Sequence, residues 1–346
     1  SFWGRIATAV GRRPAMLAVA SVVLLGALAT GVLGYRPNAN LISDLRGETD
    51  SQRGQQILEQ AFPPGELAPT TVLVQADDPR SAAEVVANAI RDIDGVERVE
   101  APVVAPSGDV ARLRVVYADD PYGTPALERT AEIREVAAQA LPDGTVLVGG
   151  ESANALDNRR GDIRDFTIIT IAMAVLILAV LTLLLRALVA PFVLLATTAL
   201  SLLAALGVTV LTWVTFGGQA GTNNRVLLYS LIFLVALGID YNILLASRIR
   251  EEMDSHGFAD GVRVALTRTG GVITSAGLIL AGTFAVLMTQ PLNSLLQFGF
   301  AMAVGLLLDT FVIRGLLVPS LFLLIGPRVW FPRRLGRSAE PAAVEG

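Results

Sequence analysis

The sequence predicts an α-helical membrane protein with six transmembrane helices in a 1+5 arrangement and an inserted extracytoplasmic α+β domain of βαββαβ, ferredoxin-like order. Of the 346 residues, 53% are hydrophobic and 17% are charged, against about 25% charged in an average soluble domain. The charged residues also occur in blocks between long uncharged runs. These blocks divide the chain into a cytoplasmic amino terminus with the first helix (1–35), the extracytoplasmic domain (36–164), a five-helix bundle (165–327) and a cytoplasmic tail (328–346).

The first transmembrane helix is predicted from the uncharged run at residues 14–35, which has about the 20 residues that a spanning helix needs. A signal peptide has a shorter apolar core before its small-residue cleavage site. The Ala-Leu-Ala at residues 27–29 loosely resembles such a site, but the run is long and a second membrane block follows, so we expect a retained helix. Arginines before the run place the amino terminus in the cytoplasm; they are Arg5, Arg12 and Arg13.

The inserted domain is predicted from the order of its patterns. Strands are expected where β-branched and other apolar residues cluster, and helices where an amphipathic run follows a capping residue. Ser81 is expected as one helix cap, with Glu84 at the capping-box spacing, and Thr124 as the other, with Pro125 in the first turn. The expected elements are strand 70–75, helix 81–93, strand 96–104, strand 110–117, helix 124–141 and strand 145–148. This order is the split βαβ arrangement.

Five more apolar segments follow, and the charges between them predict their direction. The segments are 166–185, 188–216, 226–247, 270–290 and 292–325. Basic residues fall in alternate connections and after the last segment: Arg186; Arg248, Arg250, Arg263 and Arg268; and Arg328, Arg333, Arg334 and Arg337. The positive-inside rule is satisfied if both termini are cytoplasmic and the inserted domain lies outside. We therefore expect a multi-pass protein of the inner, or cytoplasmic, membrane.

Asp240 is the only carboxylate between residues 226 and 247. A carboxylate inside a membrane helix costs about 2.5 to 3.5 kcal/mol on insertion scales, so its default interpretation is a proton or ion site. Tyr241 beside it offers a hydroxyl that can donate and accept. Ser275 lies about 10 Å inward from Arg268, a depth that matches Asp240. The alternative is that such polar residues only join helices through hydrogen bonds.

Asp309 and Arg314 form a second polar pair in the last apolar segment. Five residues of α-helix turn through about 500°, so the two side chains should diverge by roughly 140° and neutralise each other poorly. Arg314 is expected to extend to the cytoplasmic interface. For Asp309 a structural and a functional role both remain open.

Several function classes are excluded or disfavoured. Cys is absent, which excludes disulfides and thiolate metal sites, and we expect no metal, cofactor or nucleic acid. An intramembrane aspartyl protease could use Asp240 and Asp309 as a dyad, but its Gly-x-Gly-Asp signature is missing because Gly238 and Ile239 precede Asp240. We therefore expect a protein that is not an enzyme.

Three runs carry a family resemblance: LGIDYNILLASRIREE (237–252), TRTGGVITSAGLILAGTF (267–284) and LLLDTFVIRGLLVPSLFLL (306–324). They resemble the large mycobacterial membrane protein (MMPL) family of the resistance-nodulation-division (RND) superfamily. The resemblance implies proton-driven export of lipids or other hydrophobic compounds, with the family's Asp-Tyr relay at Asp240 and Tyr241. We add Ser275 and Asp309 as relay candidates. The expected partners are protons, membrane lipids and a hydrophobic or lipid-like substrate, with a porter-like domain outside.

Two alternatives share the helical layout. A protein-export accessory like the SecDF pair has the same one-plus-five order and also uses a membrane aspartate, and a sterol- or lipid-sensing module would not transport. Family members usually carry two six-helix halves, and this chain resembles the carboxyl-terminal one. We therefore expect a second half, or a further copy in a homo-oligomer, against the faces that carry Asp240, Ser275 and Asp309.

Overall fold

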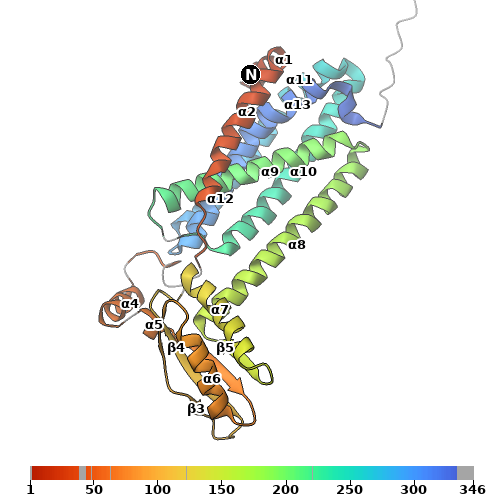
Figure 1. The fold of residues 1–346 in the computed structure, drawn as a ribbon. Helices are drawn as coiled ribbons and strands as arrows, with labels where there is room; N and C mark the ends of the chain where they lie inside the picture. The colour runs from red at the N-terminus through yellow and green to blue at the C-terminus, as the bar shows by residue number, and fades with distance from the viewer. Residues whose placement is uncertain are drawn as a thin grey trace, which may run out of the picture. The chain divides into compact units, whose positions relative to one another are not determined.

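The computed structural model describes residues 2–38, 44–47, 49–62, 64–121, 123–219 and 221–332. The chain divides into two compact units (Figure 1). The first, called the membrane unit below, contains residues 1–36 and 167–346, and the second, called the inserted unit, contains residues 37–166. The predicted tail beyond residue 332, with Arg333, Arg334 and Arg337, lies outside the described residues.

Six helical stretches in the described part of the chain are long and apolar enough to cross a membrane. This confirms the predicted number of membrane-spanning segments. The stretches are Pro14–Gly34, Glu151–Leu185, Val189–Thr215, Asn224–His256, Phe258–Thr289 and Asn293–Trp330. The second and fourth stretches are the single helices α8 and α10. The first divides into α2 (Pro14–Ala29) and η1 (Thr30–Gly34), the third into α9 (Val189–Thr209) and η2 (Val210–Thr215), the fifth into α11 (Phe258–Ala285) and η3 (Val286–Thr289), and the last into α12 (Asn293–Leu308), η4 (Asp309–Leu317), α13 (Val318–Ile325) and η5 (Gly326–Trp330). A shorter helix, α1 (Phe2–Arg12), precedes them.

The connection between α10 and α11 differs from the expected long charged loop. The two helices continue to His256 and from Phe258, so only Gly257 separates them, at φ +77°. The charged residues here are helical because they pair along and between the helices, as Arg248 does with Glu252 four residues later. Glycine permits the left-handed turn that separates the two axes.

Small residues bring the first spanning stretch, formed by α2 and η1, into close contact with α9. A Cβ atom built on Gly207 would lie 2.0 Å from the backbone oxygen of Leu28, and one built on Gly31 would lie 2.3 Å from the backbone oxygen of Gly207. Membrane helices pack through such small residues because lipid offers no hydrophobic drive for their association. These two glycines therefore hold the first spanning helix against the bundle.

The inserted unit contains one antiparallel sheet with strand order β2-β4-β1-β5, and a short β3 also pairs with β4. Its elements are α4 (Asp50–Ala61), α5 (Pro64–Leu67), β1 (Thr70–Gln75), α6 (Pro79–Arg91), β2 (Val96–Val99), β3 (Val103–Val104), β4 (Val110–Tyr117), α7 (Thr124–Ala140) and β5 (Thr145–Gly149). Alternate residues of β1 and β4 are buried in one core with side chains of α6 and α7. Both helices therefore cover the same face of the sheet (Figure 1).

Three local predictions in this unit were wrong in detail. The strand expected at 96–104 is divided into β2 and β3, because Pro102 lies between them and cannot donate to the ladder. Asp78, not Ser81, caps α6: its Oδ1 accepts from the Ser81 backbone N–H at 3.2 Å, and Pro79 occupies the first turn. Gly123, not Thr124, precedes α7.

Candidate functional site

A buried ion pair lies in the last membrane stretch, where the helix changes its hydrogen-bonding period. The segment η4 is a π-helix, in which residues five apart are joined by backbone hydrogen bonds and lie near the same face. Arg314 Nη2 donates to Asp309 Oδ2, and the two side chains are only 2% and 7% exposed. The expected divergence of this pair was wrong because it assumed α-helical geometry. The expected extension of Arg314 to the interface was wrong as well.

Arg314 also joins the last stretch to α10. Its guanidinium carbon lies 4.4 Å from the centroid of the Tyr241 ring, within the range of a cation–π contact. Its Nη2 also donates to the backbone oxygen of Gly238 at 3.3 Å. Tyr241 and Asp309, predicted separately from the sequence, are therefore brought together by Arg314, which was expected at the membrane interface. In the sequence, this role of Arg314 is indicated only by its position five residues after Asp309 within an apolar run.

Some polar atoms of this pair, and of residues next to Asp309 and Tyr241 in the sequence, have no hydrogen-bond partner. Among the described residues, Asp309 Oδ1, Arg314 Nε, Thr310 Oγ1 and Asn242 Oδ1 are buried without a hydrogen-bond partner, although the Asn242 amide donates to Thr198 Oγ1 at 3.1 Å. Leaving a buried polar atom unpaired costs about 1 to 3 kcal/mol. A polar cluster of this kind is suited to bind water, which proton transfer requires.

Asp240 lies on a different face of α10 from Tyr241, because successive helix residues are about 100° apart. Its side chain is exposed, whereas Gly238 and Asn242 are buried. It forms no hydrogen bond or ion pair within the described part of the chain. Between residues 226 and 247, the exposed residues of α10 follow a helical repeat that forms one stripe: Tyr229, Phe233, Ala236, Asp240 and Leu244. A single carboxylate thus stands in an otherwise uncharged, exposed stripe, which we call the Asp240 stripe.

Ser275 is also exposed, and its hydroxyl donates to the Val272 backbone oxygen of its own helix at 3.0 Å. The structure therefore brings Tyr241 and Asp309 into one cluster and leaves Asp240 and Ser275 on exposed surfaces. The described residues contain no group of three or more His, Cys, Asp or Glu side chains that could hold a metal ion.

Comparison with known proteins gives consistent matches. The sequence profile of the MMPL family matches residues 44–341. A Streptomyces coelicolor protein named as a membrane protein, SCO5905, is 46% identical over 96% of this chain and 40% of its own length. The apo-petrobactin exporter of Bacillus anthracis is 33% identical over 98% of this chain and 46% of its own. A Mycobacterium tuberculosis protein named as the transport protein MmpL12 is 38% identical over 76% of this chain and 23% of its own. The chain thus spans less than half the length of these relatives.

Proposed function

We propose, because this chain belongs to the MMPL family, that it forms one six-helix repeat of a transporter in which protons drive the export of lipids or other hydrophobic compounds across the cytoplasmic membrane. Membrane transport is the activity that the relatives' names describe. The observation that carries the proton-coupled part is the contrast between two carboxylates of the membrane unit. Asp309 is buried with a counter-ion, whereas Asp240 is exposed in an uncharged stripe.

This contrast suits the two carboxylates to different tasks. Arg314 neutralises Asp309, so that pair can remain charged at small net cost while it fixes the last stretch against α10. Asp240 has no cation beside it among the described residues. In an apolar setting its protonated form costs least, and the ionised form requires water or a partner cation. Asp240 is therefore the acid whose charge can change during a transport cycle, and Tyr241 connects its helix to the buried pair.

A second six-helix half is the proposed cover for the Asp240 stripe. A carboxylate directed into lipid would be expensive, while one at an interface between two repeats can share water and polar side chains. Transporters built from two repeats place coupling-ion sites near the bilayer midplane, between the repeats. The chain covers only 40% of SCO5905 and 46% of the apo-petrobactin exporter, which supports a partner of similar size, supplied by a longer chain or by a further copy.

The proposed layout is one membrane helix, an extracytoplasmic ferredoxin-like domain and five further helices, with both termini in the cytoplasm. Strand order β2-β4-β1-β5 with both helices on one face supports the ferredoxin-like assignment. The arginines at 248–268 support a cytoplasmic α10–α11 turn.

Cysteine labelling tests this orientation, because the chain has no native Cys. Ser107, Phe216 and Ser255 are exposed and therefore suitable for labelling. In intact cells, Ser107→Cys and Phe216→Cys should react with a membrane-impermeant thiol reagent. Ser255→Cys should react only after permeabilisation. Labelling of Ser255→Cys from outside would refute the proposed orientation.

The transport function is tested by efflux of a hydrophobic dye from cells that produce the complete transporter. Efflux should stop when a protonophore removes the proton gradient and should continue when ATP is depleted while the gradient is maintained. Secretion of a reporter protein should be unaffected by deletion of the transporter. Loss of reporter secretion with unchanged dye efflux would instead favour the protein-export role.

A further inference from the structure

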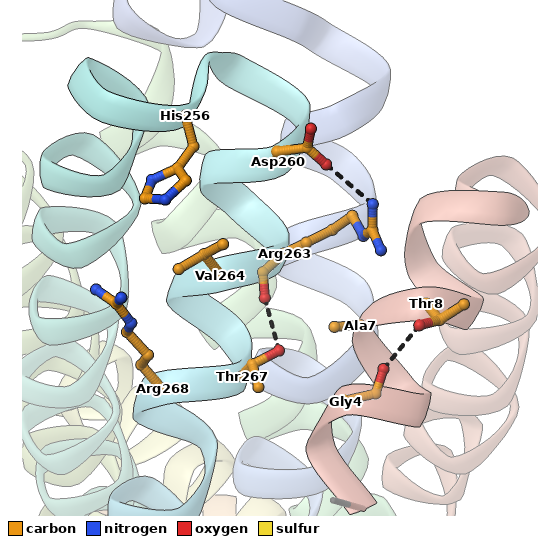
Figure 2. A pocket seen from close by; sticks show the side chains of 9 residues that line it. All are labelled: Gly4, Ala7, Thr8, His256, Asp260, Arg263, Val264, Thr267 and Arg268. Atoms are coloured by element: carbon orange, nitrogen blue, oxygen red, sulfur yellow. Dashed lines mark hydrogen bonds and ion pairs between the residues drawn. The ribbon is translucent and has the colours of Figure 1, made fainter.

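A groove of about 500 Å³ lies between α1 and the turn that joins α10 to α11. Figure 2 shows its floor along one face of α11, at Val264 and Thr267. Arg263 extends toward α1 on one side of Val264, and Arg268 lies with His256 on the other side. The groove is separate from the Asp309–Arg314 pair and from the Asp240 stripe, and transport as proposed above does not use it.

The wall formed by α1 is held firmly in place. Trp3, Ala7 and Val10 are buried on one face of this helix and pack with Leu266 of α11. Gly270 provides the space for the indole, since a Cβ atom there would lie 2.3 Å from Trp3 Cδ2. On the other end of α1, a Cβ atom at Gly11 would lie 3.1 Å from Arg263 Cδ. The aliphatic part of Arg263 is thus packed on α1, which positions its guanidinium at the groove.

The helices that bound the groove carry an excess of positive charge near it in sequence. The arginines outnumber the acids by three: Arg5, Arg12, Arg13, Arg248, Arg250, Arg263 and Arg268 against Glu251, Glu252, Asp254 and Asp260. Glu252 is 5% exposed and is shared, since it accepts a hydrogen bond from Arg268 at 2.6 Å and forms an ion pair with Arg248 at 3.1 Å. Arg248 also pairs with Glu251 at 2.6 Å, so Glu252 is the one carboxylate that pairs with Arg268 in the described part of the chain.

Both groove arginines keep donors for a ligand. Arg263 uses Nη1 to bind Asp260 at 2.9 Å, and its side chain is 46% exposed. Arg268 is 56% exposed beyond its bond to Glu252. A guanidinium has five N–H donors in a fork that matches phosphate oxygens. The hydroxyl of Thr267 is already used, since it donates to the Arg263 backbone oxygen at 2.8 Å.

In the orientation proposed above, on which this step rests, the groove lies at the depth of the lipid phosphate groups. Val264 is six residues from Gly270, about 9 Å along the helix, and the apolar part of α11 follows Gly270. The head-group layer of a bilayer occupies several ångströms on each side of the hydrocarbon core. Val264 offers apolar contact between the two cations. Basic pockets of this kind on the cytoplasmic side suit anionic lipid head groups.

We propose that this groove binds the phosphate groups of an anionic phospholipid, with Arg263 and Arg268 donating to phosphate oxygens on either side of Val264. The bound lipid would lie against α1 and α11 and would connect the amino-terminal helix to the inner leaflet.

Native mass spectrometry of the purified full chain tests the proposal, with cardiolipin and phosphatidylcholine as lipid probes and glycerol 3-phosphate as the soluble probe. The wild type should retain cardiolipin at least about tenfold more strongly than phosphatidylcholine. Arg263→Gln and Arg268→Gln should each weaken cardiolipin retention about tenfold, the loss expected for one charge-assisted hydrogen bond. Arg12→Gln is the matched control, because it removes the same charge from an exposed site outside the groove, and it should change retention less than about twofold.

Equal losses in Arg12→Gln and Arg263→Gln would overturn the proposal, since diffuse attraction to the charged surface would then explain the binding. Binding of glycerol 3-phosphate without retention of cardiolipin would reject the lipid as the source of the phosphate. If Arg268→Gln lowers the thermal unfolding midpoint, the result for Arg263→Gln decides the outcome. Asp260, the ion-pair partner of Arg263, is exposed to solvent, so the protein should tolerate the loss of the Arg263 charge.

Discussion

Asp240→Asn is expected to abolish gradient-driven export while the protein remains folded and inserted. Asparagine keeps the shape of the side chain and most of its hydrogen bonding but fixes the uncharged form. A carboxylate can use the gradient only if its two protonation states favour different helix arrangements, and each charge that crosses is worth about 2.3 kcal/mol per 100 mV. Folding should be unaffected, because the Asp240 side chain is exposed and makes no ion pair within the described residues.

The measurement is dye efflux from cells that contain equal amounts of inserted wild-type or variant transporter. Tyr241→Phe should give a partial loss, since it keeps the ring that packs on Arg314 but removes the hydroxyl. Asp254→Asn is the matched control: it removes an exposed carboxylate from the charged end of the same helix and should export at the wild-type rate. Wild-type efflux from a correctly inserted Asp240→Asn protein would remove Asp240 from the mechanism.

The second large effect is expected from separating the buried pair. Arg314→Gln leaves Asp309 as a buried negative charge without a counter-ion. Asp309→Asn likewise leaves Arg314 as a buried positive charge without a counter-ion. Removing one partner of a buried ion pair costs about 3 to 5 kcal/mol. The double variant Asp309→Asn/Arg314→Gln removes both charges and should recover a large part of that loss. The three variants can be compared by thermal unfolding in detergent, with Arg12→Gln as an exposed control.

The same variants separate a structural from a functional role for Asp309. If the pair only holds the last stretch against α10, the double variant should regain export together with stability. If Asp309 also takes part in proton transfer, the double variant should be stable and inactive. Strictly additive losses in the double variant would contradict the ion pair itself, because coupled residues in contact are not additive.

The six membrane helices could be predicted because hydropathy over about 20 residues depends on local composition. Their ends were less predictable. The extension of α10 to His256 depends on ion pairs such as Arg268 with Glu252, which join residues on different helices and do not appear in a hydropathy average. The division of strand 96–104 was within reach of the sequence, since Pro102 marks it.

The candidate site residues could be named from the sequence, but their arrangement could not. A lone carboxylate in an apolar run identified Asp240 and Asp309 by the cost of burying charge. The pairing of Asp309 with Arg314 was missed because it depends on the π-helical period of η4, which tertiary packing selects. The contact of Arg314 with Tyr241 joins two helices distant in sequence, and no local pattern could show that Asp240 and Tyr241 lie on different faces.

The most direct test of the central claim is simultaneous measurement of substrate and proton movement in vesicles that contain the complete transporter under an imposed pH gradient. The proposed mechanism predicts that wild-type vesicles move both, that a protonophore stops substrate movement, and that Asp240→Asn vesicles move neither. Substrate movement that persists without the gradient, or that continues at the wild-type rate in Asp240→Asn vesicles, would contradict it.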